Sequence, residues 1–219
     1  MTAGSNRTSP NRSQPWLPGE SGANPWRPRD VGSPARFSPS DRTVGGVVVG
    51  HWPVAEPIET ERLVLEPLRV EHADEMAPLL RDERLHEFVG GRPATPKELR
   101  SRYARQSVGR SPDGAEGWLN WILRHRETGD AVGYVQATVR LDGERPVAEL
   151  AWVVISPEQG RGYAAEAAAG MIGWLDQQGV TALIAHVHPD HRASARVAER
   201  LGLRATDVLV DGERRWVGP

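Results

Sequence analysis

The sequence has no cysteine and no long hydrophobic run, and each absence narrows what the protein can be. Without cysteine, the chain can form no disulfide and can use no cysteine nucleophile. No stretch reaches the roughly 18 apolar residues that a membrane-spanning helix needs. The N-terminus also lacks the apolar segment of a secretory signal, because Val44–Val49 is too short and lies too far into the chain. We therefore expect a cytoplasmic protein with no membrane partner.

The first 50 residues contain few large aliphatic side chains and are rich in Ser, Pro, Gly, Asn and Arg. Such a segment buries too little apolar surface to offset the entropy of ordering, so we expect residues 1–55 to form a disordered extension. Residues 56–219 are richer in Leu, Val and Ala, enough for the core of one domain. The net charge of −2 divides into about +3 on the first 50 residues and about −5 on the rest. An acidic domain lacks the basic face of nucleic-acid-binding proteins, so we expect no nucleic-acid partner.

Hydrophobic periodicity divides the second part of the chain into strands and helices. Alternation of apolar and polar residues predicts strands, and apolar residues three and four apart predict helices. The predicted strands are 62–67, 118–124, 131–141, 148–155, 182–187, 208–210 and 214–217. The predicted helices are 71–81, 96–107, a long one that runs from about Gly162 to a C-cap at Gly179, and 192–201. The apolar positions of the long helix are Tyr163, Ala167, Met171, Trp174 and Leu175.

The order of these elements predicts the fold class. An antiparallel meander is followed by one β-α-β crossover and a final hairpin. The order therefore predicts an α/β (α+β) protein with a mixed, mostly antiparallel sheet of six to seven strands and helices on both of its faces.

A glycine-bearing turn joins the predicted strand 148–155 to the long helix. Gly160 and Gly162 flank Arg161 in this turn. The first N–H groups of a helix have no internal partner and attract anions, and glycine lets a phosphate approach the main chain closely. Arg161 can add a charge-assisted hydrogen bond. The turn alone also fits an ordinary tight connection between a strand and a helix.

The residues around this turn extend the pattern. The sequence Gln159-x-x-Gly162-x-Ala164 resembles the coenzyme A pyrophosphate motif (Q/R-x-x-G-x-G/A) of the GNAT N-acetyltransferase superfamily. Further stretches look most like the RimJ and RimL branch, the ribosomal-protein alanine acetyltransferases, and these are 58–63, 148–154, 162–167 and 188–203. The resemblance covers roughly residues 58–217 and implies a GNAT-like fold for the domain 56–219.

The resemblance implies that acetyl-CoA is the acyl donor. Its pyrophosphate is expected at Gln159, Gly160, Arg161, Gly162, Tyr163 and Ala164. In the proteins that the chain resembles, the strands matching 148–155 and 182–187 splay apart, and pantetheine pairs with the first strand in the gap. By that resemblance Val153, Val154 and Ile155 contact pantetheine through main-chain atoms.

Two positions depart from the pattern of the relatives. His191 stands where they usually carry Asn, and we count it among the coenzyme-binding candidates. Many GNAT enzymes have a tyrosine that protonates the leaving thiolate where this chain has Ala198. Ser194 is the nearest replacement, and the branch that the chain resembles carries Ser there too. We therefore expect Ser194 to be the general acid.

Glu149 is the candidate general base. It shares a strand face with Ala151 and Val153, and it can take a proton from an amine directly or through water. A surface carboxylate without a catalytic role is the alternative. Because the chain has no cysteine, direct attack of the amine in a ternary complex is favoured over a covalent acyl-enzyme. A backbone N–H near Val153 is expected to stabilise the oxyanion.

Other interpretations stay open at this point. The segment 186–191 matches the zinc signature H-x-H-x-D-H of metallo-β-lactamase-like hydrolases, but no histidine follows His191 to complete such a site, so we expect no metal. A non-catalytic acyl-CoA-binding module that regulates a partner is a second alternative. The acceptor can be a protein N-terminus or a small-molecule amine, and its identity is expected to depend on residues 84–117. A second copy of the chain, forming a homodimer, is a further candidate partner.

Overall fold

A computed structural model describes residues 43–44, 47–48, 52–88 and 91–218 of the protein. Most of the expected extension, residues 1–55, lies outside these ranges. Within it, β1 (Thr43–Val44) and β2 (Val47–Val48) pair antiparallel and form a sheet of their own. No helix in the described part of the chain is both long enough and apolar enough to span a membrane.

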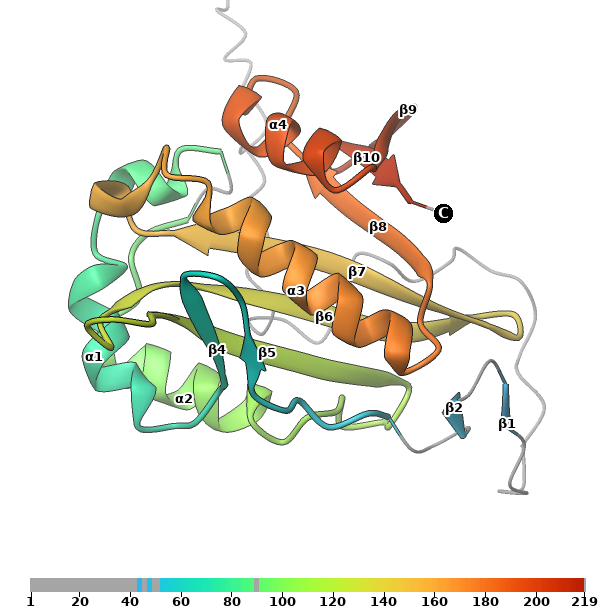
Figure 1. Cartoon of the computed structure of the whole chain (residues 1–219), viewed down its shortest axis with the longest axis horizontal. Helices are drawn as coiled ribbons and strands as arrows, with labels where there is room; N and C mark the ends of the chain where they lie inside the picture. Colours follow the sequence, from blue (N-terminus) through green and yellow to red (C-terminus); the bar gives the residue numbers. More distant parts are fainter. Residues whose placement is uncertain (1–42, 45–46, 49–51, 89–90, 219) are drawn as a thin grey trace, which may run out of the picture.

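The domain is built on one eight-stranded sheet with the strand order β3-β4-β5-β6-β7-β8-β10-β9 (Figure 1). Its strands are β3 (Ile58–Glu59), β4 (Leu63–Pro67), β5 (Glu116–His125), β6 (Ala131–Asp142), β7 (Arg145–Val154), β8 (Ala182–Val187), β9 (Arg204–Val210) and β10 (Glu213–Val217). Neighbours are antiparallel except β7 and β8, which are parallel. The predicted mixed sheet is confirmed. The strand beyond the expected six to seven is β3, whose two residues are too short to show alternation.

Helices cover both faces of the sheet, as predicted (Figure 1). On one face, α1 (His72–Leu79) and α2 (Pro96–Gln106) pack over β5 and β6 through a core that includes Met76, Leu99 and Ile122. On the other face, α3 (Tyr163–Gln177) and α4 (Arg192–Arg200) close a larger core. All five apolar positions predicted for the long helix are buried in α3. We call these the α1/α2 face and the α3/α4 face.

The parallel pair β7 and β8 is joined by α3, since parallel neighbours need a crossover connection. The two strands pair only from Val147 with Ala182 to Leu150 with Ala185. Beyond that point they diverge, and the N-terminal end of α3 lies beside the widening gap (Figure 1). The fold therefore opens its sheet at the place where the glycine turn begins a helix.

Trp52 anchors the segment that enters the domain. Its indole Nε1 donates to the Gly114 carbonyl at 2.9 Å. A Cβ placed on Gly117 would lie 2.7 Å from the Trp52 Cβ, so only glycine fits beneath this side chain. Packing against the sheet thus begins before residue 56, where we placed the domain boundary. The indole offers an isolated contact without periodicity, so the sequence pattern does not reveal it.

Candidate active site

The turn between β7 and α3 has the backbone geometry of an anion cradle. A short 3₁₀ turn, Ser156–Glu158, follows β7, and Gly160 and Gly162 then adopt φ values of +78° and +84°. Side chains rarely tolerate this left-handed conformation, so both positions require glycine. A Cβ on Gly160 would meet nothing within 4 Å, which shows that the space above the turn is open.

The helix that follows leaves its first N–H groups for a ligand. Gly162 is the N-cap of α3, and it provides no capping side chain. The hydrogen bond from the Glu166 N–H to the Gly162 carbonyl, at 3.1 Å, is the first of the helix. The preceding N–H groups of Tyr163, Ala164 and Ala165 have no carbonyl within the helix to bond. Together with the positive end of the helix dipole, they favour a pyrophosphate at this position.

Unlike the main-chain N–H groups of the turn, most of its side chains are already bonded within the protein or buried. Gln159 donates from Nε2 to the Val154 carbonyl at 2.9 Å, which ties the turn to the end of β7. The Arg161 guanidinium is exposed and lies 3.1 Å from the Glu158 carboxylate. Tyr163 is buried, so only its N–H can serve a ligand at the helix end. Of the side chains in this turn, Arg161 is thus the best placed to reach a phosphate, by giving up its contact with Glu158.

Arg62, which no sequence motif singled out, binds this turn through its main chain and through the first turn of α3. Its Nη1 donates to the Arg161 carbonyl at 3.0 Å, and its Nη2 lies 2.6 Å from the Glu166 carboxylate. The guanidinium also stacks 4.7 Å above the centre of the Tyr163 ring. The Tyr163 hydroxyl in turn lies 2.9 Å from Nε2 of His125. These contacts fix the turn to the start of β4, and no local sequence signal links residues so far apart.

The gap between β7 and β8 exposes main-chain groups of β7. Pairing with β6 continues to Val154, whereas pairing with β8 ends at Leu150. Beyond Leu150, one edge of β7 therefore has no strand beside it. An extended ligand can pair with this edge by strand addition.

The alternation of the strand decides which residues face the gap. The Ile155 N–H donates to the Val132 carbonyl of β6 at 2.9 Å. Since successive residues of an antiparallel strand direct their main-chain groups to opposite neighbours, Trp152 and Val154 face the gap, and Val153 and Ile155 face β6. The main-chain groups of Val153 and Ile155, two of the expected pantetheine contacts, are thus directed to β6. Those of Trp152 and Val154 point into the gap, where the Val154 carbonyl accepts the hydrogen bond from Gln159.

Glu149 lies at the inner end of the gap, on the α1/α2 face of the sheet. It is paired in register with Ile184 of β8 and Thr138 of β6. Its Oε1 lies 3.1 Å from Nδ1 of His186. The side chain is 23% exposed, so it is accessible to solvent and is also held by a neighbour.

Ser194 lies in the first turn of α4, on the other side of the gap. Its Oγ accepts a hydrogen bond from Nε1 of Trp152 at 3.1 Å. An indole N–H can only donate, so the Ser194 hydroxyl keeps its own proton to donate elsewhere. Glu149 and Ser194 thus flank the gap from the two faces of the sheet.

His191 is the N-cap residue of α4 and stacks on Phe88, with ring centroids 4.3 Å apart and planes inclined by 19°. Burial lowers the pKa of His191, so the imidazole is neutral near pH 7. The neighbouring histidines of the H-x-H-x-D-H segment separate: His186 contacts Glu149, and Nδ1 of His188 lies 3.9 Å from Asp190. Nowhere in the described ranges do three or more His, Cys, Asp or Glu residues gather in a way that could hold a metal ion.

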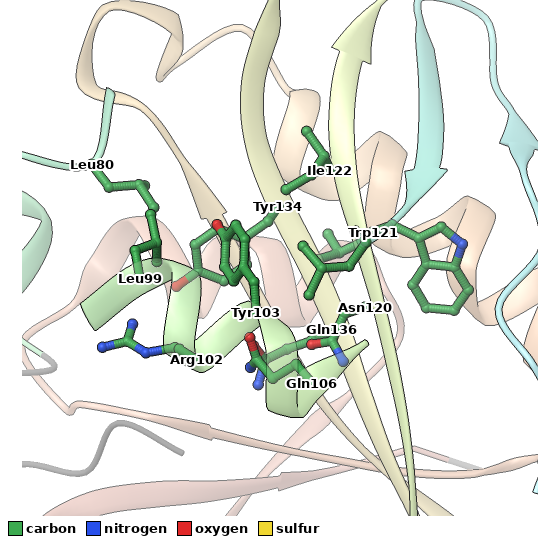
Figure 2. Close-up of a pocket in the computed structure, with 12 residues that line it drawn as sticks. Leu80, Leu99, Arg102, Tyr103, Gln106, Asn120, Trp121, Ile122, Tyr134 and Gln136 are labelled. Carbon is green, nitrogen blue, oxygen red and sulfur yellow. The ribbon is translucent and has the colours of Figure 1, made fainter. Parts of the chain in front are cut away.

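The α1/α2 face next to Glu149 carries uncharged polar side chains. Gln136 of β6 pairs with Asn120 of β5 on one side and with Ala151 of β7 on the other. It lies on the same sheet face as Thr138, the β6 residue opposite Glu149. A pocket beneath α2 is lined in part by Tyr103, Gln106, Asn120 and Gln136, and the charged Arg102 also lines it (Figure 2). The Tyr103 hydroxyl is buried there without a hydrogen-bond partner among the described residues, and burial raises its pKa, so it stays protonated. This surface lies beside the expected specificity region 84–117, and α2 belongs to that region.

The fold is shared with solved acetyltransferases. A GNAT-family acetyltransferase from Bacillus anthracis has a TM-score of 0.61 at 18% identity, covering 74% of this chain and 96% of that one. An acetyltransferase from Agrobacterium tumefaciens has a TM-score of 0.59 at 25% identity, covering 77% and 97%. RimL, the ribosomal L7/L12 α-N-protein acetyltransferase solved with coenzyme A, has a TM-score of 0.61 at 12% identity, covering 74% and 97%. The expected GNAT-like fold is thus confirmed, and RimL is among the structures that share it.

No curated protein sequence matches the chain. A family model described as the acetyltransferase (GNAT) domain does match, over residues 62–204. That match includes β4 to α4 and thus the glycine turn, the splayed strands, Glu149 and Ser194. The protein therefore belongs to the GNAT family of acetyltransferases.

Proposed function

We propose that the protein transfers an acetyl group from acetyl-CoA to a primary amine by direct attack within a ternary complex. The observation that carries the proposal is the end of the β7 and β8 pairing at Leu150 and Ala185, beside the glycine turn that begins α3. One end of this gap offers N–H groups for a pyrophosphate. The other end is flanked by a carboxylate and a hydroxyl.

The fit of the donor rests on the main chain. The N–H groups at the start of α3 suit a pyrophosphate, and the open space above Gly160 leaves room for it. The main-chain groups of Trp152 and the Val154 N–H face the gap, which suits the amides of pantetheine, in place of the expected contacts of Val153 and Ile155. That RimL shares this fold and was solved with coenzyme A supports the same ligand here.

The residues around the gap suit the transfer step. The amine nitrogen forms a bond to the thioester carbonyl carbon, and the bond from that carbon to sulfur breaks. Glu149 takes the proton that the amine loses, and Ser194 protonates the sulfur that leaves. N–H groups of β7 that face the gap stabilise negative charge on the carbonyl oxygen. No residue of the chain needs to carry the acetyl group.

The acceptor belongs on the α1/α2 face, because Glu149 is reached from that side. Gln136, Asn120 and Thr138 provide hydrogen bonds there without introducing charge. Both a protein N-terminus and a small-molecule amine fit this description.

Release of free thiol from acetyl-CoA, followed with a panel of primary amines and N-terminal peptides, tests the proposal. We expect amine-dependent thiol release that Glu149→Gln lowers by roughly 10²- to 10⁴-fold, the usual contribution of a general base. Glu127→Gln, in the exposed turn between β5 and β6, is the matched control and should keep full activity. Full activity of Glu149→Gln would remove the base from the proposal, and no thiol release with any amine would count against the transfer itself.

A further inference from the structure

His186 reaches Glu149 across the mouth of the gap. Glu149 is in register with Ile184, and His186 lies two residues further along β8 on the same face of the sheet. Main-chain pairing between the strands has already ended there, at Ala185. Even so, Nδ1 of His186 lies 3.1 Å from Oε1 of Glu149. This side-chain contact therefore spans the two strands just where their backbones separate.

The contact has a defined direction. An ionised carboxylate can only accept hydrogen bonds, so Nδ1 of His186 must carry the proton. The His186 side chain is only 7% exposed, and burial limits its movement. Oε1 of Glu149 is thereby held, and Oε2 remains to face an incoming amine.

Other charged groups surround this pair. His188 follows the end of β8, and on β10 Glu213 and Arg215 lie on the same face as His186, with Arg215 directly opposite His186. Burial raises the pKa of Glu213, the Glu149 and Asp211 charges add to that effect, and His186 and His188 oppose it. From β6, the uncharged Thr138 lies opposite Glu149. Besides Glu149, His186 thus has the charged residues Glu213 and Arg215 near it on β10.

We propose that His186 is a positioning residue for the candidate base, one that orients the Glu149 carboxylate. The inference rests on the proposed function, in which Glu149 takes the proton of the amine. The bond from His186 holds Oε1, so that Oε2 is presented to the amine in a fixed direction. Without that bond, Glu149 would still be present but would be less well aimed.

The test compares kcat and KM of His186→Ala, His186→Asn and His188→Ala. We expect His186→Ala to lower kcat about tenfold to a hundredfold, the size of a lost hydrogen bond to a charged group, with little change in KM for acetyl-CoA. Asn carries its amide N–H near the position of Nδ1, so His186→Asn should restore most of kcat. His188→Ala, which removes the neighbouring imidazole, should leave kcat and KM unchanged.

Two further measurements separate a lost positioning role from misfolding. Melting temperature and acetyl-CoA affinity of each variant identify any loss of activity caused by misfolding. If Glu149→Gln lowers kcat but His186→Ala leaves it unchanged, His186 has no positioning role and the proposed function stands. If Glu149→Gln keeps full activity, the proposed base itself is wrong. A fall in kcat that Asn does not restore, in a folded protein, would also contradict positioning.

Discussion

Arg62 and Glu166 are 104 residues apart in the sequence, yet they form a two-point ion pair at the first turn of α3. Nε of Arg62 donates to Oε2 of Glu166 at 2.7 Å, and the Arg62 main-chain N–H donates to Oε1 at 2.7 Å. Burial acts to raise the pKa of Glu166, but bonds from Thr60 and Arg62 outweigh it, and the pKa lies below its usual value. Glu166 is therefore ionised at neutral pH, and the pair fixes the glycine turn.

The first prediction follows from this pair. Arg62→Ala should raise the Kd for coenzyme A roughly tenfold, because the turn loses the bond that holds its Arg161 carbonyl. Isothermal titration measures this change. Arg126→Ala is the matched control, since Arg126 is an exposed arginine at the same edge that pairs with Glu59 at 3.1 Å. Equal Kd values for Arg62→Ala and the wild type would show that the ion pair does not shape the turn.

Gly133→Ala tests the close approach of β6 to the splayed part of β7. Gly133 has φ +157°, and a Cβ there would lie 2.1 Å from the Val153 carbonyl oxygen. Strand β7 must therefore move, which should cost about 1–3 kcal/mol of stability and weaken coenzyme binding. Gly143→Ala, in an open turn at φ +62°, should cost only about 1 kcal/mol and leave binding intact. Denaturant titration and coenzyme binding of both variants check this, and a Gly133→Ala protein that binds normally would contradict it.

Ser194→Ala tests the expected general acid. Thiolate is a fairly good leaving group, so kcat should fall near the lower end of the ~10²–10⁴-fold range, with little change in acetyl-CoA affinity. Ser194→Thr keeps a hydroxyl and should retain more activity than the alanine variant. Steady-state rates at saturating donor and acceptor decide the matter. An unchanged kcat in Ser194→Ala would leave Ser194 only its contact with the Trp152 indole.

Local patterns predicted most of the fold. The spacing of Ala167, Met171 and Leu175 predicted α3, because every third or fourth residue of a helix meets the core. Strand β9 was predicted only over 208–210, although it begins at Arg204. Its side chains are mostly exposed on both faces, so alternation gives no signal there.

The candidate site was predicted less completely. The glycine turn is a local motif and was found where the sequence placed it. The contacts of Arg62 with Glu166 and of His186 with Glu149 join distant segments, and a single sequence has no local pattern for such pairs. That the main-chain groups of Trp152 rather than those of Val153 face the gap depends on the strand register, and a shift of one residue would reverse it.

His72 should make the stability of the fold depend on pH. It is buried, and Nδ1 accepts a hydrogen bond from the Arg69 N–H at 3.1 Å. Burial, partly opposed by the Glu66 carboxylate, lowers the pKa of His72. The stability that neutral His72 gives to the fold is therefore complete above the unfolded-state pKa of about 6.5. It is lost as the pH falls through the lower pKa of His72 in the folded state.

We expect the melting temperature to fall between pH 7 and pH 5 more steeply in the wild type than in His72→Asn. The Asn side-chain oxygen can accept the same N–H bond but does not titrate. His188→Asn, which replaces a half-buried imidazole outside the core, should keep the wild-type slope. If the melting temperatures of the wild type and His72→Asn fell equally with pH, His72 would not be the cause of the loss of stability.

Binding of coenzyme A to Gly162→Glu tests the central claim most directly. The substitution places bulk and negative charge where the pyrophosphate is expected, at an N-cap with φ +84°. Gly202→Glu has the same charge at φ +78° beyond α4, and so controls for backbone strain. Isothermal titration and thermal melting should show that coenzyme A binds and stabilises the wild type and Gly202→Glu, but not Gly162→Glu. Undiminished binding by a folded Gly162→Glu protein would contradict the account.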